Sequence, residues 1–188
     1  MKKFFSYICL LLCTFLNLTL HALNISDSVP NFEAIDANGK TWSLNKFHLK
    51  KYVLLYFYPA AMTGGCTKQA CSYRDSYQDW QKLGVEVVGI SGDLPENLSL
   101  FTKAEKLPFT LLSDPDGKVA QLFRVPQKKG GIIERFFLGD KYTLERGVTI
   151  KRWTFLISKS GKLIYKNDKV DPLKDSENIM NFIKNENQ

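Results

Sequence analysis

A continuous apolar run, YVLLYFY, spans Tyr52 to Tyr58 and limits the possible folds of this chain more than any other segment. A run of this kind is typical of a strand buried on both faces of a sheet. Pro59 and the Gly64-Gly65 pair end it, and Thr67 to Lys82 then carries helix-forming residues with aromatic side chains at helical spacing. A second apolar run, GVEVVGIS, follows from Gly84 to Ser91. Together these segments predict a β-α-β unit.

The remaining segments extend this pattern. Asn38-Gly39, the strongest short signal for a hairpin turn, lies inside the alternating FEAIDANGKTWSL and predicts an N-terminal β-hairpin. Helices are expected over 95–106, 117–123 and 172–185, a strand over 109–114, and a second hairpin from KRWTFLIS and KLIYK. Gln127 to Val148 shows no clear period and is expected to be a long connection, either functional or loosely ordered. We therefore predict an α/β, thioredoxin-like fold: a central mixed β-sheet flanked by helices, with an N-terminal β-hairpin extension.

The first 22 residues differ from the rest of the chain. A basic start, Met1-Lys2-Lys3, precedes a mostly apolar stretch from Phe4 to Leu20 and the small residue Ala22. This order is typical of a secretory signal peptide, so we expect cleavage after Ala22 and one domain over residues 23–188. The protein is then expected in the periplasm or outside the cell, without membrane association. The apolar stretch is also nearly long enough to stay as an anchor.

The charge of the chain gives little support to a nucleic-acid partner. Cleavage would remove two lysines and lower the formal net charge from +7 to +5. The remaining lysines are scattered and are not interleaved with aromatic residues along one face, which is typical of a solvated surface. Nucleic-acid binding is therefore not expected.

Two cysteines remain in the expected mature chain, Cys66 and Cys71, and His48 is its only histidine. A zinc site needs four such ligands, so neither a metal nor another cofactor is expected. A permanent disulfide is common in exported proteins. However, a helix through both cysteines would place their side chains about 140° apart and their Cα atoms roughly 8 to 9 Å apart. A disulfide tolerates about 7 Å, so this spacing favours a bond that forms when the helix unwinds and is later reduced.

The position of Cys66 indicates a reactive thiol. It stands where the first strand has ended and the helix begins, so it faces unpaired backbone N–H groups and the positive end of the helix dipole. Both stabilise a thiolate. The sequence therefore predicts that Cys66 is a nucleophile and that the cysteine pair has a redox function.

The segment YPAAMTGGC fits the peroxiredoxin pattern Pro-x-x-x-Thr-x-x-Cys. The cysteine five residues later, together with PNFEAIDANGKTWSL, GISGD, LPFTLLSDPDGKVAQLF and RWTFLISKSGKLIY, resembles the Q-type peroxiredoxins. These proteins, also called bacterioferritin comigratory proteins, are a subfamily of the AhpC/TSA-like thioredoxin-fold peroxidases. The resemblance implies five site residues: Cys66 as peroxidatic thiolate, Cys71 as resolving thiol, Thr63 as a hydroxyl in the peroxide pocket, Pro59 as its shield, and Arg152 as the cation that polarises the substrate.

The resemblance also implies an activity. It is the reduction of hydrogen peroxide and organic hydroperoxides, in which Cys66 becomes a sulfenic acid and then forms an intramolecular disulfide with Cys71. A thioredoxin-like protein or another thiol would be the reductant, and the protein would be a monomer or a weak dimer. Two alternatives stay open: an exported thiol-disulfide oxidoreductase of the same fold, which normally uses Cys-x-x-Cys, and a catalytically silent binding module with a structural disulfide.

The chain departs from the family pattern at three positions near these residues. Gly64 replaces the usual Pro, Gln69 replaces the usual Glu, and Ser158 stands where Asp is frequent. Gln69 still accepts a hydrogen bond but brings no charge. None of these changes removes a group that the chemistry requires.

Overall fold

The computed structural model describes residues 23–186, so the predicted signal peptide lies outside the described residues. Its main sheet has seven strands in the order β2-β1-β5-β4-β3-β8-β9. These strands are β1 (Glu33–Asp36), β2 (Thr41–Ser43), β3 (Tyr52–Phe57), β4 (Val85–Ser91), β5 (Thr110–Ser113), β8 (Trp153–Ile157) and β9 (Leu163–Asn167). The β3-β4 and β4-β5 pairs are parallel and the others antiparallel, which confirms the predicted mixed sheet and the β-hairpin at Asn38-Gly39.

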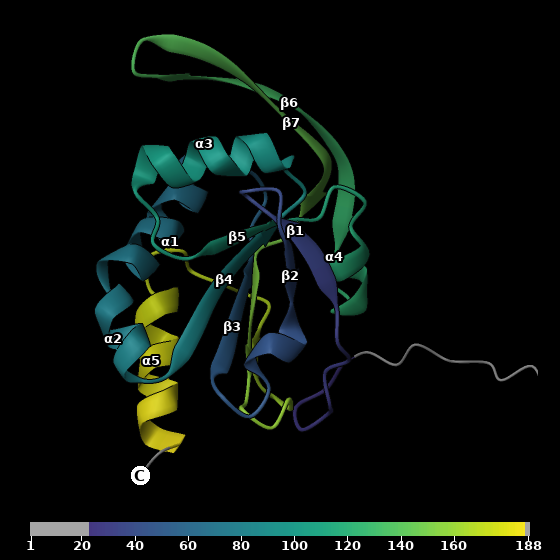
Figure 1. The fold of residues 1–188 in the computed structure, drawn as a ribbon, viewed down its shortest axis with the longest axis vertical. Helices are drawn as coiled ribbons and strands as arrows, with labels where there is room; N and C mark the ends of the chain where they lie inside the picture. Colours follow the sequence, from purple (N-terminus) through teal and green to yellow (C-terminus); the bar gives the residue numbers. More distant parts are fainter. Residues whose placement is uncertain (1–22, 187–188) are drawn as a thin grey trace, which may run out of the picture.

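Helices cover both faces of this sheet (Figure 1). They are α1 (Gly64–Asp75), α2 (Tyr77–Lys82), α3 (Pro95–Glu105), α4 (Lys118–Leu122), α5 (Asp175–Glu186) and the short 3-10 helix η1 (Leu44–Phe47). In β3, Leu54 and Tyr56 pack with residues of α1, α2, α3 and α5, whereas Val53 and Leu55 pack with residues of α4 and η1. The continuous apolar run therefore fills two cores, as predicted for a strand buried on both faces. Within residues 23–186, no helix combines the length and apolarity needed to cross a bilayer.

The helix expected over Thr67 to Lys82 is instead two helices. It begins earlier, at Gly64, and Ser76 separates α1 from α2 because its φ of −100° and ψ of 12° leave the helical region. Beyond the break, Trp80 of α2 is fully buried, and its ring centroid lies 5.9 Å from that of Tyr73 of α1. The segment is therefore helical as predicted, apart from this break.

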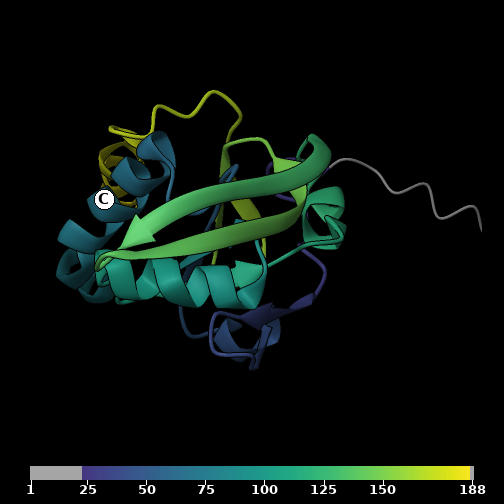
Figure 2. The ribbon, with the colours of Figure 1, turned by 90° about the horizontal axis from the view of Figure 1, so that it is seen from above.

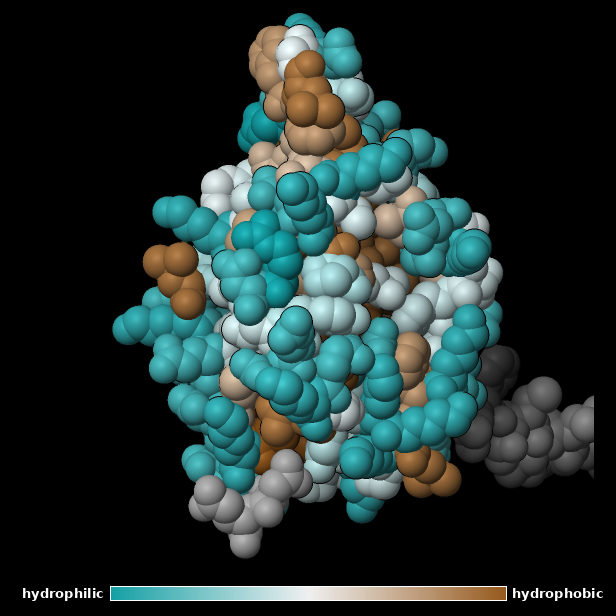
Figure 3. Space-filling model, turned by 60° about the vertical axis from the view of Figure 1, so that its left-hand side comes forward, coloured by the Kyte–Doolittle hydropathy of each residue, from teal (hydrophilic) through white to brown (hydrophobic). Residues whose placement is uncertain are grey.

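The expectation of a long unstructured connection over Gln127 to Val148 is wrong. This segment forms a two-stranded antiparallel hairpin of β6 (Gln127–Phe137) and β7 (Asp140–Ile150), which arches over α3 (Figures 1 and 2). Its tight turn, Leu138-Gly139, has positive φ at both residues, as a type I′ hairpin requires. Apolar residues occupy both faces of β6, so no alternation is visible in the sequence. Ile132 and Phe136 of β6 and Leu138 of the turn are exposed. Figure 3 shows apolar surface at the tip that projects from the molecule.

The hairpin is joined to the body of the protein by backbone contacts. Gly147 donates its N–H to the carbonyl of Gly92 at 3.0 Å, and Leu94 donates to the carbonyl of Glu145 at 3.2 Å. A Cβ on Gly92 would lie 2.1 Å from the carbonyl oxygen of Val148, so only glycine permits this approach. The hairpin therefore has a fixed position beside the carboxyl end of β4, close to the loop that follows β3.

Candidate active site

Cys66 is the third residue of α1 and follows the loop that leaves β3. Thr63, just before the helix, has extended dihedrals (φ −112°, ψ 148°), so the chain changes from extended to helical within a single residue. The Cys66 side chain is buried, with 2% of its surface exposed. Cys66 and Cys71 are both free thiols in this structure. The predicted placement of Cys66 in the first turn of a helix is thus observed.

Two polar side chains hold the loop between β3 and α1. Asp93, fully buried after β4, accepts hydrogen bonds from the N–H of Ala61 and the hydroxyl of Ser91, both at 2.8 Å. Arg135 of β6 donates from Nε to the carbonyl of Met62 at 2.7 Å. Met62 has a φ of 55°, in the left-handed region, which costs about 1 kcal/mol for a residue other than glycine. Hydrogen bonds to Ala61 and Met62 therefore hold a strained turn four residues before Cys66.

Arg152 contacts Cys66. Its Nη2 lies 3.3 Å from the Cys66 Sγ. The reason is strand register: β8 runs antiparallel to β3 with Trp153 opposite Phe57, so Arg152 lies beside the end of β3 where α1 begins. The other terminal nitrogen of Arg152, Nη1, donates to the Oε1 of Gln69 one turn along α1.

Pro59 and Thr63 lie around this contact in different ways. Pro59 and Arg152 both line an open hollow of about 390 Å³, whose walls also include Pro126 and Ile150. The Thr63 hydroxyl donates to the carbonyl of Ala60 at 2.9 Å, so it contacts the backbone of the loop. The structure thus brings Cys66 and Arg152 into contact, places Pro59 at the adjoining hollow, and leaves the Thr63 oxygen with free acceptor capacity.

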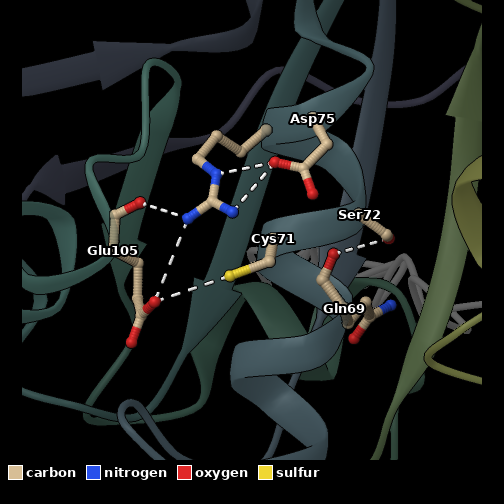
Figure 4. Close-up of polar contacts among 6 residues, drawn as sticks. Gln69, Cys71, Ser72, Asp75 and Glu105 are labelled. Atoms are coloured by element: carbon tan, nitrogen blue, oxygen red, sulfur yellow. Dashed lines mark hydrogen bonds and ion pairs between the residues drawn. The ribbon is translucent and has the colours of Figure 1, made fainter.

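Cys71 points to a different side of α1. Its thiol donates to the Oε2 of Glu105, the last residue of α3, at 3.5 Å, while the Gln69 side chain leaves α1 on another side (Figure 4). Arg74 donates to the backbone carbonyl of Glu105 at 2.8 Å and so links the same two helices. Burial raises the pKa of the Cys71 thiol, the Arg74 guanidinium lowers it, and the Glu105 carboxylate raises it. With α1 intact, the two cysteines are held apart.

Several polar residues at the site were not predicted from the sequence. Gln69 donates from Nε2 to Asp175 Oδ2 at 2.7 Å, and the hydroxyls of Tyr73 and Thr154 donate to that same oxygen at 2.6 and 2.7 Å. Nothing in the sequence indicated Asp175, because an acidic residue at the start of a helix is common for its favourable interaction with the helix dipole. The residues around Glu105 and Arg135 likewise did not indicate that either side chain belongs to the site. Within residues 23–186, no group of three or more His, Cys, Asp or Glu side chains is arranged to hold a metal ion.

Sequence comparison identifies the class of protein that this fold and site define. The AhpC/TSA family matches residues 25–166, and the chain belongs to this family. Peroxiredoxin Bcp of Escherichia coli (strain K12) is 39% identical over 165 residues, which cover 88% of this chain and 98% of that protein. The chloroplastic peroxiredoxin Q of Populus jackii is 43% identical over 147 residues, which cover 77% of this chain and 61% of that protein. The predicted resemblance to the Q-type, or Bcp, peroxiredoxins is confirmed.

Solved structures agree with the fold. Peroxidoxin BcpB from Mycobacterium tuberculosis superposes with a TM-score of 0.72 at 29% identity, covering 87% of this chain and 97% of that one. A cysteine-to-serine mutant of Xylella fastidiosa PrxQ gives a TM-score of 0.74 at 21% identity over 89% of this chain and 99% of that one, a likeness of fold alone. The predicted thioredoxin-like architecture is confirmed. The chain spans 61% of the length of the Populus relative and 48% of that of the chloroplastic peroxiredoxin Q of Triticum aestivum.

Replacing Glu105 with Gln is expected to lower the pKa of Cys71, because it removes a negative charge that disfavours the thiolate. In a Cys66→Ser background, alkylation of Cys71 at neutral pH should therefore become faster, measured at Cys71 itself by peptide mass mapping. Glu96→Gln, an exposed change at the other end of α3, is the matched control and should leave the rate unchanged. Equal rates for the two variants would show that Glu105 does not restrain Cys71.

Proposed function

We propose that this protein reduces hydrogen peroxide and organic hydroperoxides with Cys66 as the reacting thiolate. One observation carries the proposal: Arg152 Nη2 lies 3.3 Å from Cys66 Sγ at the start of α1. Arg152 and Pro59 also line an open hollow of about 390 Å³, large enough for a small molecule. The match to Bcp of Escherichia coli over 98% of that protein supports the same conclusion.

The first step is an attack of the Cys66 thiolate on the nearer oxygen of the peroxide. An S–O bond forms as the O–O bond breaks, so the sulfur is oxidised to a sulfenic acid, and the second oxygen leaves as water or an alcohol after taking a proton. Negative charge develops on that leaving oxygen. Arg152 and the first N–H groups of α1, which lack helical acceptors, are positioned to stabilise it. One such donor typically contributes a factor of about 10² to 10³ in rate.

The second step is closure of a disulfide between Cys66 and Cys71. The Cys71 thiol loses its proton, an S–S bond forms, and the sulfenic oxygen leaves as water. Because α1 places the two side chains on different sides, its first turns must unwind before the sulfurs meet. Gly64 and Gly65 begin this helix, and each glycine makes a helix less stable than alanine would, by up to about 1 kcal/mol. The sequence of α1 therefore favours unwinding at the turn that must open.

A thiol reductant then restores the two cysteines, and we propose a thioredoxin-like protein for this role. The alternative of a thiol-disulfide oxidoreductase is less compatible with the site. Such an enzyme must bring its nucleophile to a disulfide on another protein, whereas the Cys66 side chain is only 2% exposed. Consumption of peroxide, without rapid reduction of insulin, distinguishes the two activities.

Cys66→Ser is expected to abolish peroxide reduction, because serine has no sulfur to oxidise. Cys71→Ser should leave the first oxidation intact and let a sulfenic acid persist at Cys66, which a sulfenic-acid trapping reagent and mass analysis would detect. Undiminished turnover by Cys66→Ser would falsify the peroxidase proposal. A lack of trapped sulfenic acid in Cys71→Ser would instead show that Cys71 is not the resolving thiol.

Oxidation is expected to unfold the first turns of α1. Closing the disulfide breaks several backbone hydrogen bonds there, each contributing about 1 kcal/mol net. Amide hydrogen exchange between about Thr67 and Arg74 should therefore speed up in the oxidised form, while β3 and β4 should change little. The control is the Cys71→Ser variant treated with the same peroxide. If exchange is identical in both redox states with the disulfide confirmed by mass, the unwinding step is wrong.

We further propose that the protein is exported to the periplasm or the medium, on the basis of the basic and apolar residues 1–22. N-terminal sequencing of protein from its native host is expected to begin at Leu23. An intact Met1 on cytoplasmic protein would contradict export, whereas Met1 in a membrane fraction would indicate an uncleaved anchor.

A further inference from the structure

The first residue of α5, Asp175, is a fully buried carboxylate close to the active site. Three side chains donate to its Oδ2, at 2.6 to 2.7 Å: Gln69, Tyr73 and Thr154. Its Oδ1 has no hydrogen-bond partner among the described residues. A buried carboxylate that only accepts hydrogen bonds is arranged as an ion, and an ion away from water needs a compensating charge.

Gln69 connects this carboxylate to the catalytic arginine. Its Nε2 donates to Asp175 and its Oε1 accepts from Arg152 Nη1. An ionised carboxylate can only accept and a guanidinium can only donate, so this orientation of the amide is the one that satisfies both partners. Turning the amide round would place its NH₂ group against Arg152 and its oxygen against Asp175. The carboxylate therefore determines which end of Gln69 faces the arginine.

The contacts form one continuous path from Cys66 through Arg152 and Gln69 to Asp175. Gln69 itself brings no charge, so the negative charge on this path comes from α5. We propose, on the basis of the function proposed above, that Asp175 is a positioning residue for peroxide reduction: it fixes the Gln69 amide, which orients Arg152 at the Cys66 thiolate. The C-terminal helix thereby contributes to a site that is otherwise built from α1 and β8.

A purely structural role for Asp175 makes a different prediction. Burial raises the pKa of Asp175, while hydrogen bonds from Tyr73, Thr154 and Gln69 lower it. Replacing this buried charge with a neutral group of the same shape therefore need not destabilise the fold. A structural residue would show its effect in thermal stability, whereas a positioning residue shows it in the reactivity of Cys66.

The test is a set of variants made in the Cys71→Ser background, in which only the first oxidation step occurs. Asp175→Asn removes the charge, and its amide can present either an oxygen or an NH₂ group to Gln69, so it no longer determines how Gln69 faces Arg152. Oxidation of Cys66 by hydrogen peroxide is therefore expected to slow about tenfold or more, because a small misplacement of Arg152 is costly in the transition state. Thermal unfolding should change little.

Rescue distinguishes positioning from structure. Adding Gln69→Glu to Asp175→Asn places the carboxylate directly against Arg152, and the rate should return to within about threefold of the parent. The control variant, Ile183→Val, removes one buried methyl group about two turns further along α5 and leaves every hydrogen bond to Asp175 in place. It should lower thermal stability yet keep the rate within about twofold of the parent.

Three results would overturn the proposal. Asp175→Asn could be oxidised as fast as the parent, or its slower oxidation could persist after Gln69→Glu is added. The third result is an oxidation rate that falls in proportion to thermal stability across all variants. If Asp175→Asn alone does not fold, Gln69→Glu is compared with the double variant. The proposal requires the double variant to react at least as fast, and a slower double variant refutes it. A parent that fails to react with peroxide at all would instead remove the proposed function.

Discussion

The contact between Arg152 and Cys66 depends on the pairing of two strands that lie far apart in the sequence. β8 pairs antiparallel with β3, and this register places Arg152 beside the end of β3, where the loop to α1 begins. The contact joins the buried sulfur of Cys66 to the flexible side chain of Arg152, which needs a second partner to keep its orientation. Gln69 accepts a hydrogen bond from the Arg152 guanidinium and donates one to the carboxylate of Asp175. The geometry of the reacting thiol is therefore a property of the sheet and of two helices together.

Helix α1 has two opposing requirements. In the proposed mechanism, its first turn must be helical to give Cys66 its backbone N–H groups and its contact with Arg152, yet the same turn must open for Cys71 to reach Cys66. Glycines at the first two positions reduce the stability of this turn. Further along, Cys71 and Arg74 bind Glu105 at the end of α3 and hold the rest of the helix in place. The helix is thus least stable at its first turn, whereas the part that carries Cys71 is attached to α3.

The sequence by itself determined the features that depend on local patterns. The apolar runs predicted the central strands, Asn38-Gly39 predicted the first hairpin, and the strand end followed by two glycines predicted a helix that starts near Cys66. Arg152 was identified only through family resemblance, since a charged residue beside a strand carries no local signal of its own.

Tertiary structure decided the rest. Ser76 divides the expected helix into α1 and α2, a break that the helix-forming residues of this segment do not indicate. The β6-β7 hairpin was not predicted because its apolar residues lie on both faces and hide the strand period. Asp175 lies 106 residues from Gln69 in the chain, and its role depends on one oxygen at 2.7 Å. Hydrogen bonds between distant residues are made only after the strands and helices have packed, so no pattern of neighbouring residues could have revealed them.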